Sequence, residues 1–283
     1  MRVFLILTSL VIFSTLTIAQ ERRLIDVGGY RLDVKIKRGG SVNIIFEAGA
    51  GDDISSWDSI FDEVGTFATT IAYSRAGHGN SEMSEAPRTT ETIYRDFVVL
   101  CDSLSINDSV ILVGHSRGGF LVRYYTSQNP ALIDGLVIID GSHEEQEKRL
   151  WELDSAAWKQ GQERMEEMMK MAKSGEFDVP PGAIGEAEEN IINRMIIRGG
   201  ENMPELPDIP IAVFTSLANP QYSEQRLQLV RDLHSEWTVS SKNALWMVTD
   251  KLGHYIHQEK PELVTNIIKY MNDLVVADQK AEE

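Results

Sequence analysis

The sequence predicts an α/β fold with a mostly parallel central β-sheet flanked by helices. Short apolar runs, such as residues 110–113 and 136–139, are typical of strands that helices cover on both faces. Amphipathic stretches with helical spacing, such as residues 93–104, lie between these runs. Because strand and helix patterns alternate along the chain, we expect crossover connections between parallel strands.

The individual elements follow from the same patterns. Residues 30–37 alternate apolar and polar side chains, which predicts a half-exposed edge strand. Apolar runs predict buried strands at residues 44–46, 70–73, 110–113, 136–139, 211–214 and 244–248. Amphipathic spacing predicts helices at residues 93–104, 119–128, 224–233 and 261–276.

Residues 144–205 break the alternation, since no strand pattern occurs there. Amphipathic spacing predicts two helices, over residues 151–172 and 184–195, with Pro180-Pro181-Gly182 between them. We interpret residues 144–205 as a helical cap, or lid, inserted after strand six. The core domain then consists of residues 20–143 and 206–283.

The first residues have the pattern of an export signal. Arg2 precedes an apolar run at residues 3–16, and the small residue Ala19 ends a stretch that a signal peptidase accepts. We predict a cleaved signal peptide over residues 1–19 and a secreted or periplasmic protein. A retained membrane anchor is the alternative.

Composition restricts the partners. The chain has 27 Lys and Arg against 43 Asp and Glu, a formal net charge of -16. Such a chain repels nucleic acid and anionic membranes, so we expect neither a nucleic-acid partner nor a stable membrane association after signal cleavage. We expect a small-molecule substrate instead. The single cysteine, Cys101, forms no intramolecular disulfide and is expected in the core.

The most informative motif is Gly-His-Ser-Arg-Gly at residues 114–118, between a predicted strand and a predicted helix. A serine between them, with glycine two residues before and two after, is typical of the sharp turn that exposes a catalytic nucleophile. The motif therefore predicts Ser116 as a nucleophile. The alternative is an ordinary turn whose serine caps the following helix.

A serine nucleophile needs a base that removes its proton. His254 follows the last predicted strand and comes after the serine in the chain, as this strand-turn-helix architecture requires. We predict His254 as the base. His257 is the alternative, three residues further on.

The serine turn and the Gly253-His254 pair resemble the α/β-hydrolase superfamily, over about residues 24–276. A second motif, Tyr-Ser-Arg-Ala-Gly-His-Gly-Asn-Ser at residues 73–81, is similar to that family's Y-D-R-x-G-x-G-x-S. The resemblance implies an oxyanion hole formed by the backbone amides of Arg117 and Ala50. Many relatives have His-Gly where this chain has Ala48-Gly49, so the histidine that usually braces this loop is missing.

The acid of a catalytic triad departs from the commonest family pattern, because no carboxylate directly follows strand seven. Asp140, at the end of strand six, is our first candidate, in a place that some relatives use. Glu224, a little beyond strand seven, is the alternative acid, and Asp250 is a third choice. An aspartate in the place of Asp140 can also merely cap a turn.

These features predict an exported serine hydrolase that cleaves small, uncharged or apolar esters, or related acyl substrates, through Ser116, His254 and Asp140. We expect no cofactor and no metal. Ser116 argues against dehalogenase and epoxide-hydrolase chemistry, which requires an aspartate nucleophile in this family. The alternative function is a ligand-binding protein on a hydrolase scaffold without turnover.

Overall fold

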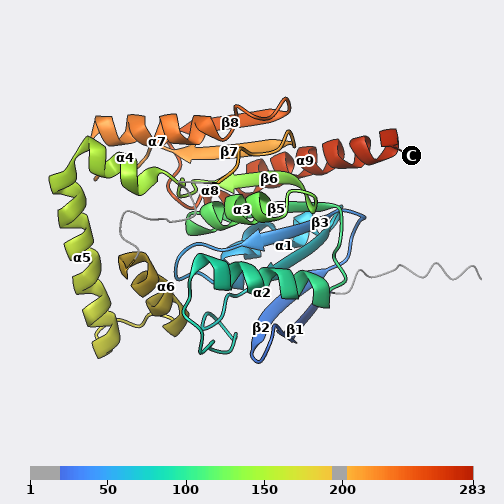
Figure 1. Ribbon diagram of the computed structural model, residues 1–283. Helices are drawn as coiled ribbons and strands as arrows, with labels where there is room; N and C mark the ends of the chain where they lie inside the picture. The colour runs from blue at the N-terminus through green and yellow to red at the C-terminus, as the bar shows by residue number, and fades with distance from the viewer. Residues whose placement is uncertain (1–19, 193–202, 283) are drawn as a thin grey trace, which may run out of the picture.

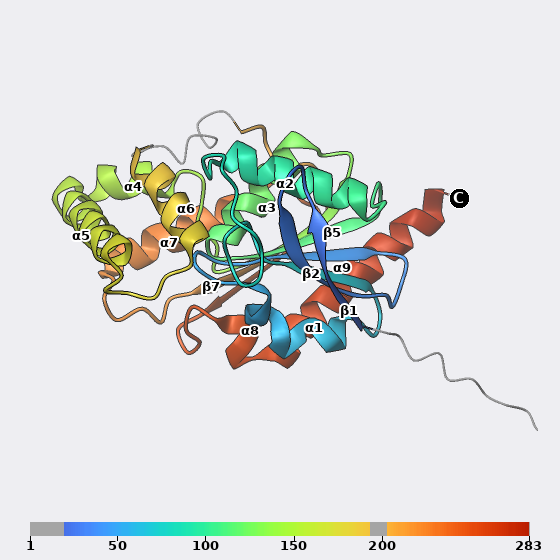
Figure 2. The same cartoon turned by 90° about the horizontal axis from the view of Figure 1, so that it is seen from below.

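The computed structural model describes residues 20–192 and 203–282 and has one central sheet with helices on both faces (Figures 1 and 2). Within these residues the sheet has eight strands in the order β1-β2-β4-β3-β5-β6-β7-β8. The pairs β1/β2 and β2/β4 are antiparallel, and the remaining neighbours are parallel. The predicted signal peptide and the end of the second predicted cap helix lie outside the described residues.

The elements follow the predicted alternation of strands and helices. The strands are β1 (Gln20–Asp26), β2 (Arg31–Lys37), β3 (Asn43–Glu47), β4 (Thr69–Tyr73), β5 (Val110–His115), β6 (Ile133–Ile139), β7 (Ile211–Ser216) and β8 (Ala244–Thr249). The helices are η1, a 3₁₀ turn (Ile54–Trp57), α1 (Asp58–Val64), α2 (Thr90–Ser103), α3 (Arg117–Gln128), α4 (Gln146–Leu153), α5 (Ser155–Ser174), α6 (Pro181–Ile192), α7 (Glu224–Glu236), α8 (Ile256–Glu259) and α9 (Pro261–Glu282).

The central strands are apolar throughout because both of their faces are covered. In β6, Leu136 and Ile138 belong to one buried cluster, while Val137 and Ile139 belong to the cluster on the opposite face. Helices α2 and α3 cover the first face, and α1, α8 and α9 cover the second (Figure 2). The two-residue repeat of a strand thus builds two cores from each apolar run.

The structure adds the short helical segments η1, α1 and α8 to the expected elements, and it differs from the expectation at β1 and at residues 151–172. β1 was not expected, because six of its seven residues are exposed and its composition is polar. The predicted helix over residues 151–172 is divided into α4 and α5 at Asp154, whose carboxylate accepts hydrogen bonds from the amides of Ala156 and Ala157. Asp154 therefore caps a new helix instead of continuing the first.

Helices α4, α5 and α6 lie between β6 and β7 in the chain, on one side of the sheet in Figure 1. Their function as a cap stays a prediction. Among the described residues, no helix has the length and apolar character needed to cross a membrane.

Candidate active site

Ser116 occupies the sharp turn between β5 and α3. Its backbone has φ 54° and ψ -121°, in the positive-φ range that residues other than glycine rarely adopt. A Cβ at Gly114 would lie 2.4 Å from the carbonyl oxygen of Gly118, and a Cβ at Gly118 would lie 2.1 Å from that of Glu47. Both positions therefore require glycine. Ser116 is formally the N-cap of α3, but its side chain makes no capping hydrogen bond.

The strained turn is held against the end of β6. The amide of Ser116 donates to the carbonyl of Ile139 at 3.1 Å, and the amide of Ser142 donates to the carbonyl of Ser116 at 2.9 Å. These bonds place the serine next to the residues that follow β6. Unusual backbone angles of this kind persist where the surrounding structure enforces them.

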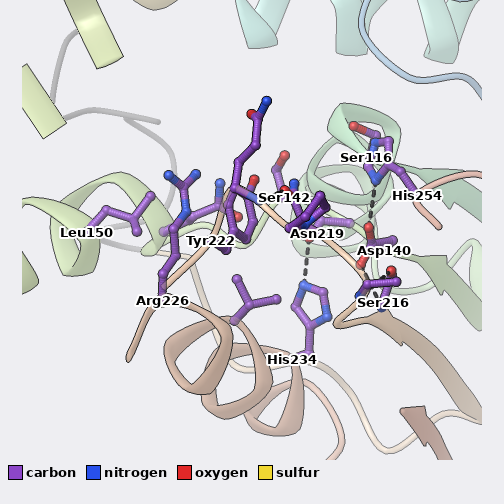
Figure 3. Close-up of a pocket in the computed structure, with 16 residues that line it drawn as sticks. Ser116, Asp140, Ser142, Leu150, Ser216, Asn219, Tyr222, Arg226, His234 and His254 are labelled. Atoms are coloured by element: carbon purple, nitrogen blue, oxygen red, sulfur yellow. Dashed lines mark hydrogen bonds and ion pairs between the residues drawn. The ribbon is translucent and has the colours of Figure 1, made fainter. Parts of the chain in front are cut away.

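His254 and Asp140 form the shortest polar contact of the site, with 2.6 Å between His254 Nδ1 and Asp140 Oδ2 (Figure 3). Because a carboxylate only accepts hydrogen bonds, Nδ1 carries the proton, and Nε2 of a neutral imidazole is the acceptor. In Figure 3 the His254 ring lies between Ser116 and Asp140. The three side chains line one cavity.

The main chain around β7 fixes the carboxylate of Asp140. Its second oxygen, Oδ1, accepts from the amide of Ser216 at 2.9 Å. The Ser216 hydroxyl in turn donates to the carbonyl of Leu252 at 2.7 Å, two residues before His254. The acid and the histidine loop are therefore both tied to the end of β7.

The other acid candidates lie elsewhere. Glu224 is exposed in the first turn of α7 and does not line the cavity. Asp250 is exposed and pairs with Lys251 at 3.3 Å. The structure thus brings Asp140, and neither alternative, to His254.

The alternative base, His257, is fully buried against Trp57, and burial and the nearby His115 lower its pKa to about 3.

The predicted oxyanion donors lie on either side of the serine turn. Arg117 is the first residue of α3, and Ala50 lies in the loop after β3. A Cβ at Gly49 would lie 3.4 Å from Cβ of Ser116, so this loop passes directly beside the serine. No acceptor for the Ala50 amide is found in the part of the chain that the structure describes.

Arg75 braces the Ala50 loop, a role that the sequence reading missed. Its guanidinium donates to the carbonyls of Ala48 at 2.7 Å and Gly49 at 2.8 Å. Arg75 lies in the motif after β4, so this motif supplies the brace that the missing histidine would give. The arginine in that motif was the available signal.

Arg75 belongs to a buried arginine cluster that we define as Glu47, Arg75, Arg117 and Glu186. Arg75 Nη1 lies 2.8 Å from Glu47 Oε1, and Nε lies 2.6 Å from Glu186 Oε1. Glu186 Oε2 lies 3.1 Å from Arg117 Nε. Because Glu186 comes from α6, this cluster ties the helices between β6 and β7 to the serine turn.

Burial and charge oppose each other in this cluster. Burial favours a neutral Glu186, but Arg75 and Arg117 outweigh it and lower the pKa of Glu186 to about 2. Burial also acts against the charge of Arg75, yet Glu186 and Glu47 raise its pKa above the ordinary value. For Glu47 burial prevails over Arg75 and raises the pKa.

The cavity beside Ser116 has a volume of about 560 Å³. Its walls come from the end of β6, from the end of β7 and the loop that follows it, and from α4 and α7. Apolar contacts come from Leu150 and Val230, while Gln146, Tyr222 and Arg226 contribute polar groups. Within the described residues, no cluster of three or more His, Cys, Asp or Glu side chains could hold a metal ion.

Comparisons with known proteins agree with this fold. Residues 42–165 match the family model of the alpha/beta hydrolase fold. The chain is 22% identical over 241 residues to the uncharacterized protein YqjL of Bacillus subtilis, covering 84% of this chain and 87% of that protein.

Solved structures with the same fold include two ester-cleaving enzymes. The thermophilic esterase from Thermogutta terrifontis has a TM-score of 0.64 at 17% identity, covering 90% of this chain and 99% of that one. The enol-lactonase from Burkholderia xenovorans LB400 has a TM-score of 0.63 at 16% identity, covering 88% and 99%.

The match over residues 42–165 and the likeness to these solved structures show that the chain has the α/β-hydrolase fold. The predicted α/β-hydrolase fold is confirmed, and the esterase and lactonase among these structures support the prediction of a hydrolase enzyme.

Proposed function

We propose that this protein is an exported serine hydrolase that cleaves small esters through an acyl-enzyme. The observation that carries the proposal is the contact of 2.6 Å between His254 and Asp140, in the same cavity as the strained Ser116. A cavity of about 560 Å³ suits a small-molecule substrate. Export rests on the signal-like residues 1–19 alone.

The proposed reaction assigns one role to each of the three side chains. His254 Nε2 takes the proton of the Ser116 hydroxyl as Oγ attacks the ester carbonyl. Asp140 holds the ring by its Nδ1 proton and stabilises the imidazolium that forms. The imidazolium then protonates the leaving alcohol.

The charge that develops on the carbonyl oxygen needs fixed donors. The amides of Ala50 and Arg117 fill this role in our proposal, and Arg75 keeps the Ala50 loop in place. Water, activated by His254, releases the acid product from Ser116 in the second half of the reaction.

Active-site labelling tests the proposal. A fluorophosphonate probe should label Ser116 in the wild-type protein and should fail to label the Ser116→Ala variant. Hydrolysis of p-nitrophenyl butyrate should fall by at least about 1000-fold in that variant. Equal rates for the two proteins would favour the ligand-binding alternative.

For export, N-terminal sequencing of the secreted protein should give a start at Gln20.

A further inference from the structure

Arg226 is the one arginine among the residues that line the cavity beside Ser116. It lies in the first turn of α7, where its amide donates to the hydroxyl of Ser223 at 3.2 Å. The other ionisable residues in the cavity wall are Asp140, Tyr222, His234 and His254. A guanidinium is charged at every physiological pH, so Arg226 brings a fixed positive charge to this wall.

Arg226 differs from the other sheltered arginines because it has no carboxylate partner among the described residues. Each of the others that is buried or half-buried in the described part pairs with Asp or Glu: Arg75 and Arg117 with Glu186, Arg88 with Asp96, Arg123 with Glu144, and Arg149 with Glu145. For Arg226, the described residues contain no ion-pair partner within 4.0 Å, and its buried Nε makes no hydrogen bond to them. In a chain of net charge -16, an unpaired arginine in a cavity wall needs an explanation.

The aromatic ring of Tyr222 holds the guanidinium in place. The Arg226 Cζ atom lies 3.7 Å from the centroid of the Tyr222 ring. Stacking of this kind orients the guanidinium plane and leaves its edge, with the N–H donors, for a ligand. A guanidinium edge matches the two oxygens of a carboxylate.

Arg226 is remote from the reacting atoms. In Figure 3, Arg226 and Tyr222 lie on the Leu150 side of the cavity, whereas Ser116 and His254 lie on the other side. A group that contacts Arg226 therefore belongs to a part of the substrate well away from the scissile bond.

We infer that Arg226 binds a carboxylate of the substrate, so that the preferred substrates are esters carrying a carboxylate several bonds from the scissile carbonyl. This inference rests on the proposed ester hydrolysis at Ser116. It replaces the expectation of uncharged or apolar esters, which was made from the sequence before the residues that face the cavity were known.

Matched substrate pairs test the inference on both sides of the ester bond. Mono-methyl adipate and methyl hexanoate differ by a carboxylate in place of a methyl group on the acyl side, and 4-acetoxybutanoate and butyl acetate differ in the same way on the alcohol side. Initial rates of acid release give kcat/KM for each ester. The variants are Arg226→Gln, Arg226→Lys, and Arg231→Gln as the control, because Arg231 is an exposed arginine on the same helix that does not line the cavity.

We expect Arg226→Gln to lower kcat/KM for the carboxylate ester of at least one pair by about 10- to 100-fold, the range of a charged hydrogen bond. Its neutral partner should change less than about threefold, since it makes no such bond. Arg226→Lys should restore part of the preference, and Arg231→Gln should leave it unchanged.

Other results overturn the inference. One is that Arg226→Gln lowers kcat/KM equally for both members of each pair, and another is that it lowers kcat/KM for neither. A third is that the wild type hydrolyses only the neutral esters. Failure of the proposed function is a different result: p-nitrophenyl butyrate would then be hydrolysed equally by wild type and Ser116→Ala. A thermal melt of Arg226→Gln shows whether this variant is folded. If it is not, the same substrate comparison is made with Arg226→Lys.

Discussion

Two groups of charged side chains adjoin the Ser116 turn, and they differ in access to water. On the cavity side, the side chain of His254 is 45% exposed and that of Asp140 is 14% exposed. Behind the turn, Arg75, Glu47 and Glu186 of the buried arginine cluster are each 3% exposed or less. The first pair lines the cavity beside Ser116, and the second group holds backbone segments together.

The difference teaches how one turn can be both reactive and rigid. A histidine that exchanges protons with a substrate must reach the cavity and keep one ring nitrogen unengaged by the protein. The charged groups that fix the Ala50 loop and α6 exchange no protons with a substrate. They can therefore be buried, where their pairing is strong at the cost of desolvation. Substitutions on the two sides should therefore affect different quantities.

The largest expected effect is on the cavity side. Asp140→Asn should lower kcat by about 10,000-fold, because the amide no longer enforces the proton on His254 Nδ1. Steady-state hydrolysis of p-nitrophenyl butyrate measures it. The melting temperature should change little, so that activity and stability separate.

Glu224→Gln is the matched control for this experiment, since it removes one carboxylate that lies outside the cavity. Its kcat should stay close to that of the wild type. Comparable losses in both variants, or a loss in Glu224→Gln alone, would contradict the assignment of Asp140.

On the buried side, Glu186→Gln should destabilise the protein by about 3 kcal/mol, because Arg75 and Arg117 then lose a buried countercharge. Urea unfolding measures the free energy. Glu188→Gln on the same helix is the control, since Glu188 forms an exposed ion pair with Lys173. If both variants unfold at the same urea concentration, the cluster does not hold α6 to the core.

The smallest expected effect concerns acid stability and tests the buried, neutral state of His257, the alternative base. The folded-state pKa of His257 is lowered to about 3, below the ordinary value of 6.5. Between these pH values the unfolded chain takes up a proton at His257 that the folded chain does not. The contribution of neutral His257 to the free energy of unfolding is therefore complete above pH 6.5 and is lost as the pH falls.

The free energy of unfolding of the wild type should fall between pH 6.5 and 5, and in His257→Phe this fall should be smaller by about 2 kcal/mol. The figure follows from about 1.4 kcal/mol per pH unit for one proton. Urea unfolding of the variant and the wild type at both pH values measures this. Buried His78 and His143, whose pKa values are lowered to about 4, keep part of the pH dependence in the variant. An unchanged slope would show that His257 is protonated in the folded protein.

The sequence by itself determined the central strands, the main helices and the serine turn. Apolar runs and helical spacing are local properties, and they report which faces of an element must be buried. The glycines at 114 and 118 report a steric requirement that also acts within one turn. β1 escaped prediction because an edge strand with a mostly exposed, polar composition has no such local signal.

Only the tertiary structure decided which charges meet. By chain position, Asp140 and Glu224 were both eligible acids, yet Asp140 alone contacts His254, 114 residues away. Arg75 and Glu186 are 111 residues apart and meet because α6 packs back on the core. That Arg226 has no carboxylate partner among the described residues is likewise visible only once its neighbours are known. Side-chain periodicity is set by the local backbone, whereas a charge finds its partner through the packing of distant segments.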